Sequence, residues 1–291
     1  MAIHYYDLFS SQWSSKNFGD DINPFLLSKL LDPSIIASSD VCVIGIGSIL
    51  NRDNAERVSQ YRRKVVFSTG AGYGEPLKDL DNSWDIACVR GPKTAEIMGL
   101  PPSKAICDGA ILLSDYFDPI VKSKRGGIVF IPHIRTHWGT GKALRLICDD
   151  LGWRYLSPDA LAEDFIEAVR SARLVITEAM HGAILADTMR VPWIPVALHQ
   201  HNDFKWRDWF LSIEQDYRCN FLLPKLWNPK ESAVIGRLKY PYQKWKMNRL
   251  QRQMRSLPEE CTPSLSSEEL LNRKKVQLRE KLDYINHTYS V

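Results

Sequence analysis

The chain has 291 residues, of which 44% are hydrophobic and 25% are charged, a composition typical of a folded globular protein with room for two domains. This composition excludes a chain that is disordered over most of its length. The formal net charge of +4 at pH 7 is too small to indicate nucleic-acid binding, and we expect no nucleic-acid partner.

Short apolar segments alternate with helical stretches through the first part of the chain. Strands are predicted over residues 5–9, 41–44, 64–68 and 86–89, and helices over 23–31, where Pro24 marks the start, and over 93–98. Strand, loop and helix in repetition favour a parallel sheet with helices on both faces. We therefore predict a Rossmann-like domain over residues 1–120.

A second alternating region follows a basic, proline-containing segment at residues 115–127, which we interpret as a linker. Beyond it, strands are predicted over 127–131, 153–156, 173–176 and 191–196, and helices over 141–151, 159–172 and 183–189. The predicted fold class is α/β, with two Rossmann-like domains facing across a cleft in a GT-B-like arrangement. The second domain is expected over residues 121–223, and a C-terminal helical extension over 224–291.

The composition changes in the C-terminal extension. Residues 225–255 carry nine Lys or Arg side chains against the single acid Glu231, interleaved with Trp and Tyr. This segment is either a solvated face or a surface for peripheral contact with an anionic membrane. A capping box at residues 266–269 predicts a final helix, whose apolar face packs back on the body through Leu271, Leu278, Leu282 and Ile285.

The cysteines and the N-terminal residues indicate in which cellular compartment the protein is expected. The six cysteines are scattered without a CxxC pair, which favours buried small side chains over disulfides or zinc sites. The start of the sequence has no secretory signal pattern, and no run approaches the length of a membrane span. We expect a cytoplasmic protein, at the inner membrane surface if the basic segment binds lipid.

The segment from Val175 to Asp187 is the strongest candidate for chemistry. It reads as a buried strand that passes through His181-Gly182 into a helix. A histidine there lies at the carboxyl end of a parallel strand, where open α/β sheets bind ligands, beside the free N–H groups of a helix start. An imidazole also titrates near neutral pH. Anionic substrates suit such a site.

Glycine-rich turns follow several predicted strands of the first domain. Asn17, Gly19 and Asp20 precede the first helix and can cap it or receive hydroxyl groups. The glycines of 45–48 and 69–74 allow close backbone approach. Neither segment completes a GxGxxG fingerprint, and the sequence contains no GxxxxGK[ST] loop, so a nicotinamide enzyme or a P-loop NTPase is disfavoured.

Five segments stand out together in chain order: Asn17-Phe18-Gly19-Asp20, Val89-Arg90-Gly91-Pro92-Lys93-Thr94, Asp108 to Leu113, Ile131-Pro132-His133 and Met180 to Ala186. In order and spacing they resemble the polysaccharide pyruvyl transferase family, most closely its succinoglycan-type branch, which decorates bacterial exopolysaccharides. The resemblance spans roughly residues 15 to 215, and 204–209 also fit. It implies a GT-B-like fold and transfer of the enolpyruvyl unit of phosphoenolpyruvate to two hydroxyls of a glycan or lipid-linked oligosaccharide, leaving a pyruvate ketal. No metal or organic cofactor is implied.

The resemblance also assigns residues. The family's motif histidine corresponds to His181, its arginine to Arg90 and its acidic position to Asp108, with Gly109 in place of proline. Many members carry arginine two positions before the histidine, where this chain has Ala179. The positive groups available to phosphoenolpyruvate elsewhere in the sequence are Lys93, His133, Arg135, Lys142, Lys205 and Arg207.

We predict that His181 protonates the methylene carbon of phosphoenolpyruvate and that Arg90 helps to bind this donor. Asp20, Asp108, Glu178 or His133 accepts the hydroxyl protons, and the sequence does not choose among them. Two other hypotheses remain open: a GT-B nucleotide-sugar glycosyltransferase, and a non-catalytic glycan-binding or assembly protein, which the alanine at position 179 makes plausible.

Overall fold

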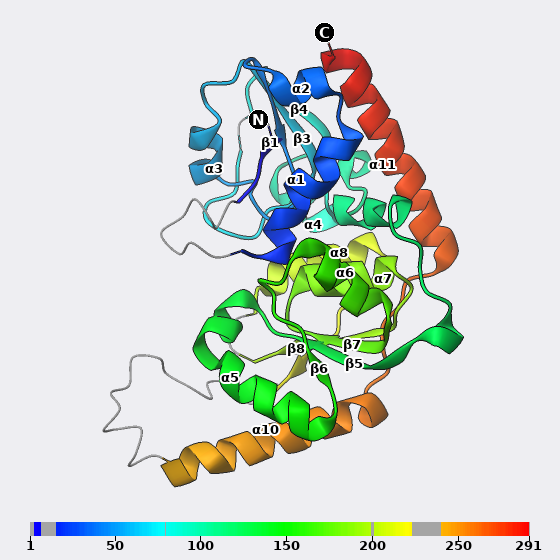
Figure 1. Cartoon of the computed structure of the whole chain (residues 1–291). Helices are drawn as coiled ribbons and strands as arrows, with labels where there is room; N and C mark the ends of the chain where they lie inside the picture. The colour runs from blue at the N-terminus through cyan, green and yellow to red at the C-terminus, as the bar shows by residue number, and fades with distance from the viewer. Residues whose placement is uncertain (1–2, 7–15, 79, 199–200, 223–239, 291) are drawn as a thin grey trace. The chain divides into compact units, whose positions relative to one another are not determined.

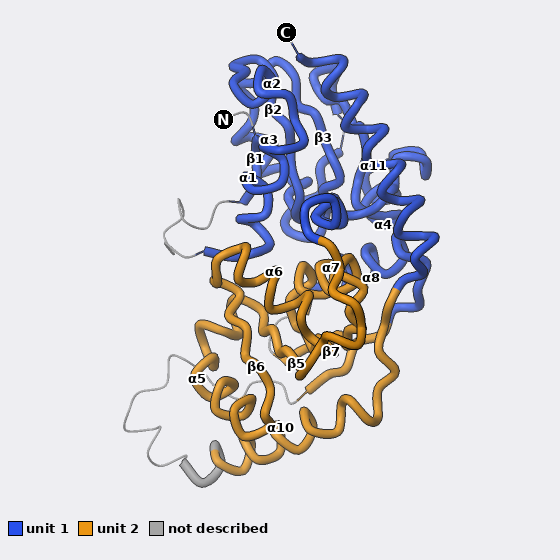
Figure 2. Tube along the Cα trace, turned by 45° about the vertical axis from the view of Figure 1, so that its right-hand side comes forward, with its two compact units in different colours: residues 1–117, 202–217, 266–291 blue, residues 118–201, 218–265 orange. Residues whose placement is uncertain are grey.

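The computed structural model of the chain describes residues 3–6, 16–78, 80–198, 201–222 and 240–290. The chain folds into two compact units, each built on one parallel β-sheet (Figure 2). The predicted α/β class is confirmed. The GT-B-like arrangement of two domains across a cleft stays a prediction.

Unit 1 is a four-stranded sheet in the order β1-β2-β3-β4, with every neighbouring pair parallel (Figure 1). Its strands are β1 (Ile3–His4), β2 (Val41–Ile44), β3 (Arg63–Thr69) and β4 (Trp84–Val89). Its helices are α1 (Phe18–Leu30), α2 (Pro33–Ala37), α3 (Arg52–Arg57), α4 (Pro92–Ile97), α8 (Asp203–Ser212) and α11 (Glu268–Tyr289), with the 3-10 turns η1 (Pro102–Lys104) and η2 (Gly109–Asp115). Successive residues of β2 and β3 are buried on both faces, which explains why these strands read as continuous apolar runs.

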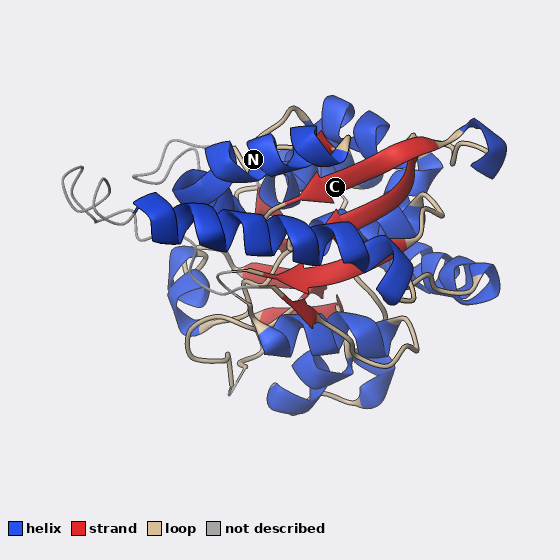
Figure 3. Cartoon of the chain, turned by 90° about the horizontal axis from the view of Figure 1, so that it is seen from below, coloured by secondary structure: helices blue, strands red, loops and turns tan. Residues whose placement is uncertain are grey.

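Unit 2 is a five-stranded parallel sheet in the order β6-β5-β7-β8-β9. Its strands are β5 (Gly126–Ile131), β6 (Arg154–Tyr155), β7 (Ala172–Thr177), β8 (Trp193–Ala197) and β9 (Asn220–Phe221). Its helices are α5 (Ile134–Leu151), α6 (Ala162–Arg170), α7 (Met180–Thr188) and α10 (Tyr240–Glu260), with the 3-10 turn η3 (Lys122–Lys124). One face of the sheet packs on α5 and on α10, which lies across the strands and contributes Leu250, Met254 and Leu257 to the core (Figure 3).

The two units are interleaved in the sequence. Unit 1 comprises residues 1–117, 202–217 and 266–291, and unit 2 comprises 118–201 and 218–265. The three contiguous segments predicted from the sequence divide the chain differently: 202–217 and the final helix belong with the first sheet. In α11, Asn286 donates to the carbonyl of Leu30 at 2.9 Å and accepts from the amide of Asp32 at 2.9 Å, which fixes this helix to unit 1.

The bounds of several predicted elements differ from the structure, among them α5, which begins at Ile134 and not at residue 141. The first strand is β1 at Ile3–His4, and Tyr5 and Tyr6 are outside it, while residues 7–9 of the predicted strand lie outside the described residues. Helix α1 begins at Phe18, well before the predicted start, and contains Pro24. Proline lacks the N–H that would bond the carbonyl of Asp20, and the side-chain amide of Asn23 donates to that carbonyl at 3.1 Å instead. The final helix is capped by Ser267, whose hydroxyl accepts from the amide of Leu270.

Within the described part of the chain, every helix is too short or too polar to span a lipid bilayer. The predicted basic segment is described only in part: Lys225, Lys230, Arg237 and Lys239 lie outside the described residues.

The cysteines separate into two groups by burial. Cys42, Cys88, Cys107 and Cys148 are buried, and burial raises the pKa of each thiol to about 12, whereas Cys219 and Cys261 are half-buried. A buried thiol that holds its proton at neutral pH is a poor nucleophile.

We expect iodoacetamide at pH 8 to modify Cys219 and Cys261 in the native protein and all six cysteines after denaturation, as measured by peptide mass spectrometry. Native modification of Cys88 as fast as that of Cys261 would contradict this.

Candidate active site

Predicted functional residues gather at the carboxyl edge of the unit 1 sheet. The segments after β2, β3 and β4 leave the sheet at this edge because the three strands are parallel. A short segment at 105–107 joins them through the amide of Ile106, which donates to the carbonyl of Val89 at 3.0 Å. Asp108 follows this segment, is fully buried, and caps η2 by accepting from the amide of Ala110 at 3.0 Å.

Gly109 stands where the family resemblance expects proline, and the structure gives a reason. A Cβ atom at this position would lie 2.3 Å from the hydroxyl of Ser68, a distance that no real contact allows. Ser68 is buried and has a left-handed backbone with φ of 57°, at an irregularity in the pairing of β3 with β4. A side chain at the turn after Asp108 would therefore require Ser68 and Ile46 to shift.

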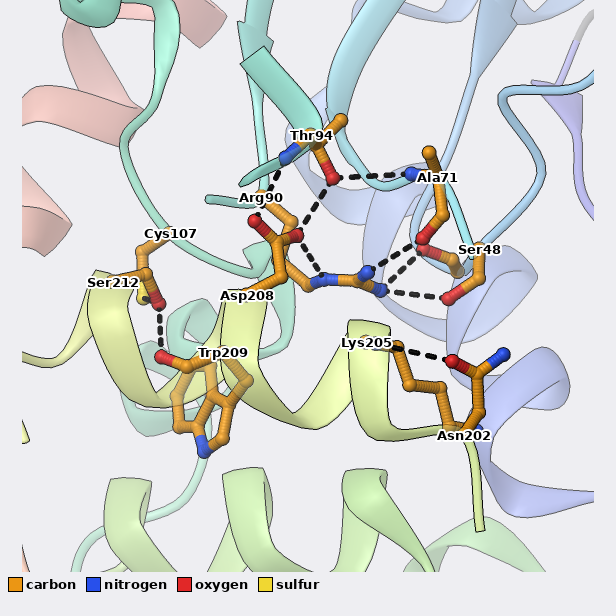
Figure 4. Close-up of polar contacts among 11 residues, drawn as sticks. Ser48, Ala71, Arg90, Thr94, Cys107, Asn202, Lys205, Asp208, Trp209 and Ser212 are labelled. Carbon is orange, nitrogen blue, oxygen red and sulfur yellow. Dashed lines mark hydrogen bonds and ion pairs between the residues drawn. The ribbon is translucent and has the colours of Figure 1, made fainter. Parts of the chain in front are cut away.

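Arg90 is buried at the end of β4, and its guanidinium bonds groups from three other segments (Figure 4). Nε donates to a carboxylate oxygen of Asp208 at 3.0 Å, and Nη2 donates to the carbonyl of Ala71 at 2.9 Å. Nη1 donates to the carbonyl of Gly47 at 3.0 Å and to the hydroxyl of Ser48 at 2.7 Å. Each of the three guanidinium nitrogens of the predicted donor-binding arginine thus donates inside unit 1, where the side chain holds the segments after β2 and β3 together.

Asp208 of α8 is the counterpart of Arg90, with a side chain that is also 0% exposed. Its carboxylate accepts from the backbone amide of Thr94 at 3.0 Å and from the Thr94 hydroxyl at 2.6 Å, which fixes α8 to the first turn of α4 (Figure 4). A Cβ on Gly91 would lie 2.4 Å from both the backbone and the side chain of Asp208. We call Arg90, Thr94 and Asp208 the buried hub. Asp208 is not among the predicted site residues, although an acid flanked by tryptophans is a signal of a buried partner.

The predicted sugar-binding residues of the first segment form the start of α1. Asn17 donates from its side chain to Asp20 at 2.6 Å, both are half-buried, and Gly19 is buried within the helix. Asn23, which the sequence analysis did not assign to the site, is buried and binds both backbone groups of Ile46, accepting at 2.6 Å and donating at 2.9 Å. This amide fixes the glycine turn after β2.

The basic residues of α8 and α4 differ in their surroundings. Nζ of Lys205 donates to the hydroxyl of Tyr73 at 3.1 Å and lies 5.4 Å from the centre of that ring. Arg207 is exposed and pairs with Asp203 one turn earlier. Lys93 is half-buried in the first turn of α4. All three belong to unit 1, whereas the sequence analysis assigned Lys205 and Arg207 to the second domain.

Glu178 organises the carboxyl edge of the unit 2 sheet. Its side chain is buried, and its two carboxylate oxygens accept from the amides of His133 at 2.9 Å and Leu198 at 3.0 Å. Its own amide donates to the carbonyl of Ile131 at 2.8 Å. These bonds join the segments that follow β5, β7 and β8. Hydrogen bonds to a carboxylate are stronger than neutral ones, so Glu178 fixes the relative positions of the three strand ends.

His181 is the second residue of α7 and is half-buried. The turn that leads to it is fixed by Thr177, whose hydroxyl accepts from the amide of Ala179 at 3.0 Å and donates to the Ala179 carbonyl at 2.8 Å. A Cβ on Gly182 would lie 2.7 Å from that hydroxyl and 2.9 Å from the side chain of Ile131, so glycine lets α7 pack closely on the sheet. The imidazole is thereby held at the positive end of a helix.

His133 and Arg135 lie on the same edge, at the start of α5. His133 is half-buried, and its Nδ1 caps the helix by accepting from the amide of Arg135 at 3.3 Å. The side chain of Arg135 is exposed, as is that of Lys142 two turns further along the helix. Unit 2 therefore brings His133, Arg135, Glu178 and His181 to one sheet edge.

Comparison with known proteins agrees with the resemblance. The sequence profile of the polysaccharide pyruvyl transferase family matches residues 2–200. The chain is also 37% identical over 215 residues to the succinoglycan biosynthesis protein ExoV of Rhizobium meliloti (strain 1021). That match covers 71% of this chain and 65% of the relative, so the chain spans just under two thirds of its length. The fold is α/β with two parallel β-sheets, and the family profile matches more than half of the residues. The chain therefore belongs to the polysaccharide pyruvyl transferase family.

Proposed function

We propose that this protein transfers the enolpyruvyl unit of phosphoenolpyruvate to two hydroxyls of one sugar in a bacterial polysaccharide or its lipid-linked precursor. The observation that carries the proposal is the position of His181, half-buried in the first turn of α7 at the carboxyl edge of the unit 2 sheet. Membership of the pyruvyl transferase family supports it. So does similarity to a protein named for succinoglycan biosynthesis.

The donor requires positive groups because phosphoenolpyruvate carries a carboxylate and a phosphate. Unit 2 offers the N-termini of α5 and α7, the imidazole of His133 and the exposed guanidinium of Arg135. We propose that Arg135 supplies the cation that the motif position Ala179 does not. Arg90, in contrast, is buried in the hub, and we propose that it positions the first turn of α4 without touching the donor.

The proposed reaction begins with a proton. The protonated imidazole of His181 gives its proton to the methylene carbon of phosphoenolpyruvate, which makes the adjacent carbon electrophilic. One sugar oxygen bonds to this carbon and releases its proton to a base. The second sugar oxygen then displaces phosphate, releases its own proton, and completes a ketal whose methyl group carries the proton from His181. The net products are one ketal and one hydrogen phosphate.

Donor choice tests the proposal. Phosphoenolpyruvate at 100 times its dissociation constant should stabilise the protein by about 2.7 kcal/mol, visible as a higher Tm, whereas nucleotide sugars should not raise it. Free phosphate should appear only when the donor and a glycoside with two free hydroxyls are both present. Stabilisation by a nucleotide sugar alone would favour a glycosyltransferase, and glycan binding without phosphate release would favour a binding protein.

We also propose that the outward face of α10 contacts an anionic membrane surface. Residues 240–258 contain no Asp or Glu. Three apolar side chains of this helix enter the core of unit 2, and the basic side chains Lys244, Arg249, Arg252 and Arg255 are exposed. Trp245 is 47% exposed, with the Arg249 guanidinium 5.5 Å from its ring centre.

A charge reversal on α10 tests the membrane proposal. Each basic residue near an anionic bilayer contributes about 1 kcal/mol, so the triple substitution R249E, R252E and R255E should abolish binding. The measurement is sedimentation with vesicles that contain phosphatidylserine, at low salt, with neutral phosphatidylcholine vesicles as the control. Equal sedimentation of wild type and triple variant would contradict a role for this face.

A further inference from the structure

A second polar cluster lies at the carboxyl edge of the unit 2 sheet and is not used by the proposed donor chemistry. It consists of His137 on α5, Tyr155 at the end of β6, and Ser157 and Asp159 in the segment that follows. β6 is parallel to β5 in a register that pairs Tyr155 with Phe130, and Leu156 donates to the carbonyl of Phe130 at 2.9 Å. The segment after β6 therefore leaves the sheet on the same side as His133, one helical turn before His137.

The imidazole of His137 is held from two directions. Its Nδ1 lies 2.8 Å from the hydroxyl of Tyr155, and its Nε2 lies 3.6 Å from a carboxylate oxygen of Asp159. The Ser157 hydroxyl lies 3.3 Å from Nδ1 and 3.4 Å from Nε2, and donates to the other oxygen of Asp159. The side chain of His137 is 19% exposed and that of Asp159 is 41% exposed. The cluster is thus anchored on the buried tyrosine and reaches the surface at its carboxylate.

A glycine in the middle of α5 makes room for this contact. A Cβ on Gly141 would lie 3.0 Å from the Tyr155 hydroxyl and 3.1 Å from Nδ1 of His137. Gly139, in the same helix, has no heavy atom within 4 Å of such a Cβ. Glycine weakens a helix, so its presence at position 141 fits a backbone that must approach the phenol and the imidazole closely.

Burial favours a neutral His137 ring at pH 7. Burial lowers the pKa of His137, Arg145 acts in the same direction, and Asp159 opposes both. Arg145 also lies over the ring of Tyr155, with 4.7 Å between its guanidinium carbon and the ring centre. Burial raises the pKa of Tyr155, so the phenol keeps its proton. Because a carboxylate only accepts, the single N–H of the neutral ring faces Asp159 from Nε2, and Nδ1 accepts from the Tyr155 hydroxyl, so the imidazole holds the carboxylate in place.

We infer that His137, Ser157 and Asp159 form a subsite for the paired hydroxyls of the acceptor sugar. A carboxylate with two oxygens accepts from two adjacent hydroxyls, and the charge strengthens both bonds. Trp138, the next residue of α5, is 40% exposed. The inference rests on the proposed function, because it names the place where the two hydroxyls that become the ketal are first held.

Binding without the donor separates this inference from the proposed function. Methyl glycosides of the common hexoses are titrated into the full-length protein in the absence of phosphoenolpyruvate, with saturation-transfer NMR and calorimetry as readouts. The wild type is expected to bind at least one of these glycosides. D159N and H137Q should each weaken that binding about 10-fold to 100-fold, because each removes one charge-assisted or buried hydrogen bond. D150N, on the exposed last turn of α5, is the matched control and should bind like wild type.

The outcomes are distinct. Equal affinities of wild type, D159N and H137Q, or the absence of glycoside binding by the wild type, would overturn the subsite. A wild type that binds a glycoside, loses it in D159N, and yet forms no ketal with phosphoenolpyruvate would overturn the proposed function and leave the subsite in place. For a glycoside that the protein converts, D159N should raise the KM of that glycoside by the same factor as its dissociation constant and leave the KM of phosphoenolpyruvate unchanged. A general loss of folding would instead lower the amount of active protein and leave both KM values unchanged. Circular dichroism checks that each variant is folded.

Discussion

Replacing Asp208 with alanine is expected to lower the free energy of unfolding by about 3 to 5 kcal/mol. The substitution leaves the Arg90 guanidinium buried without its carboxylate and removes the acceptor for both the amide and the hydroxyl of Thr94. An uncompensated buried charge is among the few changes that destabilise a protein this strongly. Urea unfolding followed by far-ultraviolet circular dichroism measures the loss.

The same helix supplies a matched control for this prediction. Asp203 pairs with Arg207 on the outer face of α8, where the two side chains are 52% and 49% exposed. D203A should therefore cost less than about 1 kcal/mol. A cycle of R90A, D208A and the double variant should give a coupling energy above about 1 kcal/mol, because the residues share one network. Equal losses in D203A and D208A would contradict the structural role of the buried hub.

Replacing His181 with glutamine is expected to reduce kcat for ketal formation by about 10²-fold to 10⁴-fold, the usual contribution of a general acid. Glutamine keeps much of the size and the hydrogen-bonding capacity of histidine but cannot give a proton to carbon. The KM of phosphoenolpyruvate should change far less than kcat, since the interaction is made in the transition state. Steady-state phosphate release measures both constants.

H287Q controls for this substitution, because His287 is exposed on α11 in unit 1. It should retain wild-type rates, and both variants should keep the far-ultraviolet spectrum of the wild type. A His181 variant that turns over as fast as H287Q would remove the imidazole from the acid role and leave the proton source to another residue of the same sheet edge.

The inner strands of the two sheets could be predicted from the sequence because they are short, apolar and buried on both faces, whereas the edge strand β1 was misplaced and the edge strand β9 was not predicted. β2 was predicted with its observed bounds, and β7 to within one residue at each end. The first residues of the helices were harder to predict from the sequence. Pro24 reads as a first-turn residue, yet the side chain of Asn23 satisfies the carbonyl that proline cannot bond, and α1 continues through it.

The partners of the polar residues could not be predicted, because they depend on contacts far apart in the chain. Arg90 and Asp208 are separated by 118 positions, and nothing in the local pattern of either residue names the other. The same pair lies where α8 of unit 1 packs on α4. The sequence likewise predicts Glu178 as a candidate base near His181. In the structure its carboxylate accepts from two backbone amides, in the segments that follow β5 and β8. Sequence motifs indicated the sheet edges where polar residues gather, and the fold decided which of them are buried.

The most direct measurement of the proposed activity is the mass of the acceptor after incubation with the protein and phosphoenolpyruvate. We predict that a glycoside with two suitably placed hydroxyls gains the mass of one pyruvate less one water, that one phosphate is released per ketal, and that H181Q gives neither. An acceptor of unchanged mass across lipid-linked and synthetic glycosides, or a gain equal to a sugar residue when nucleotide sugars are supplied, would contradict it.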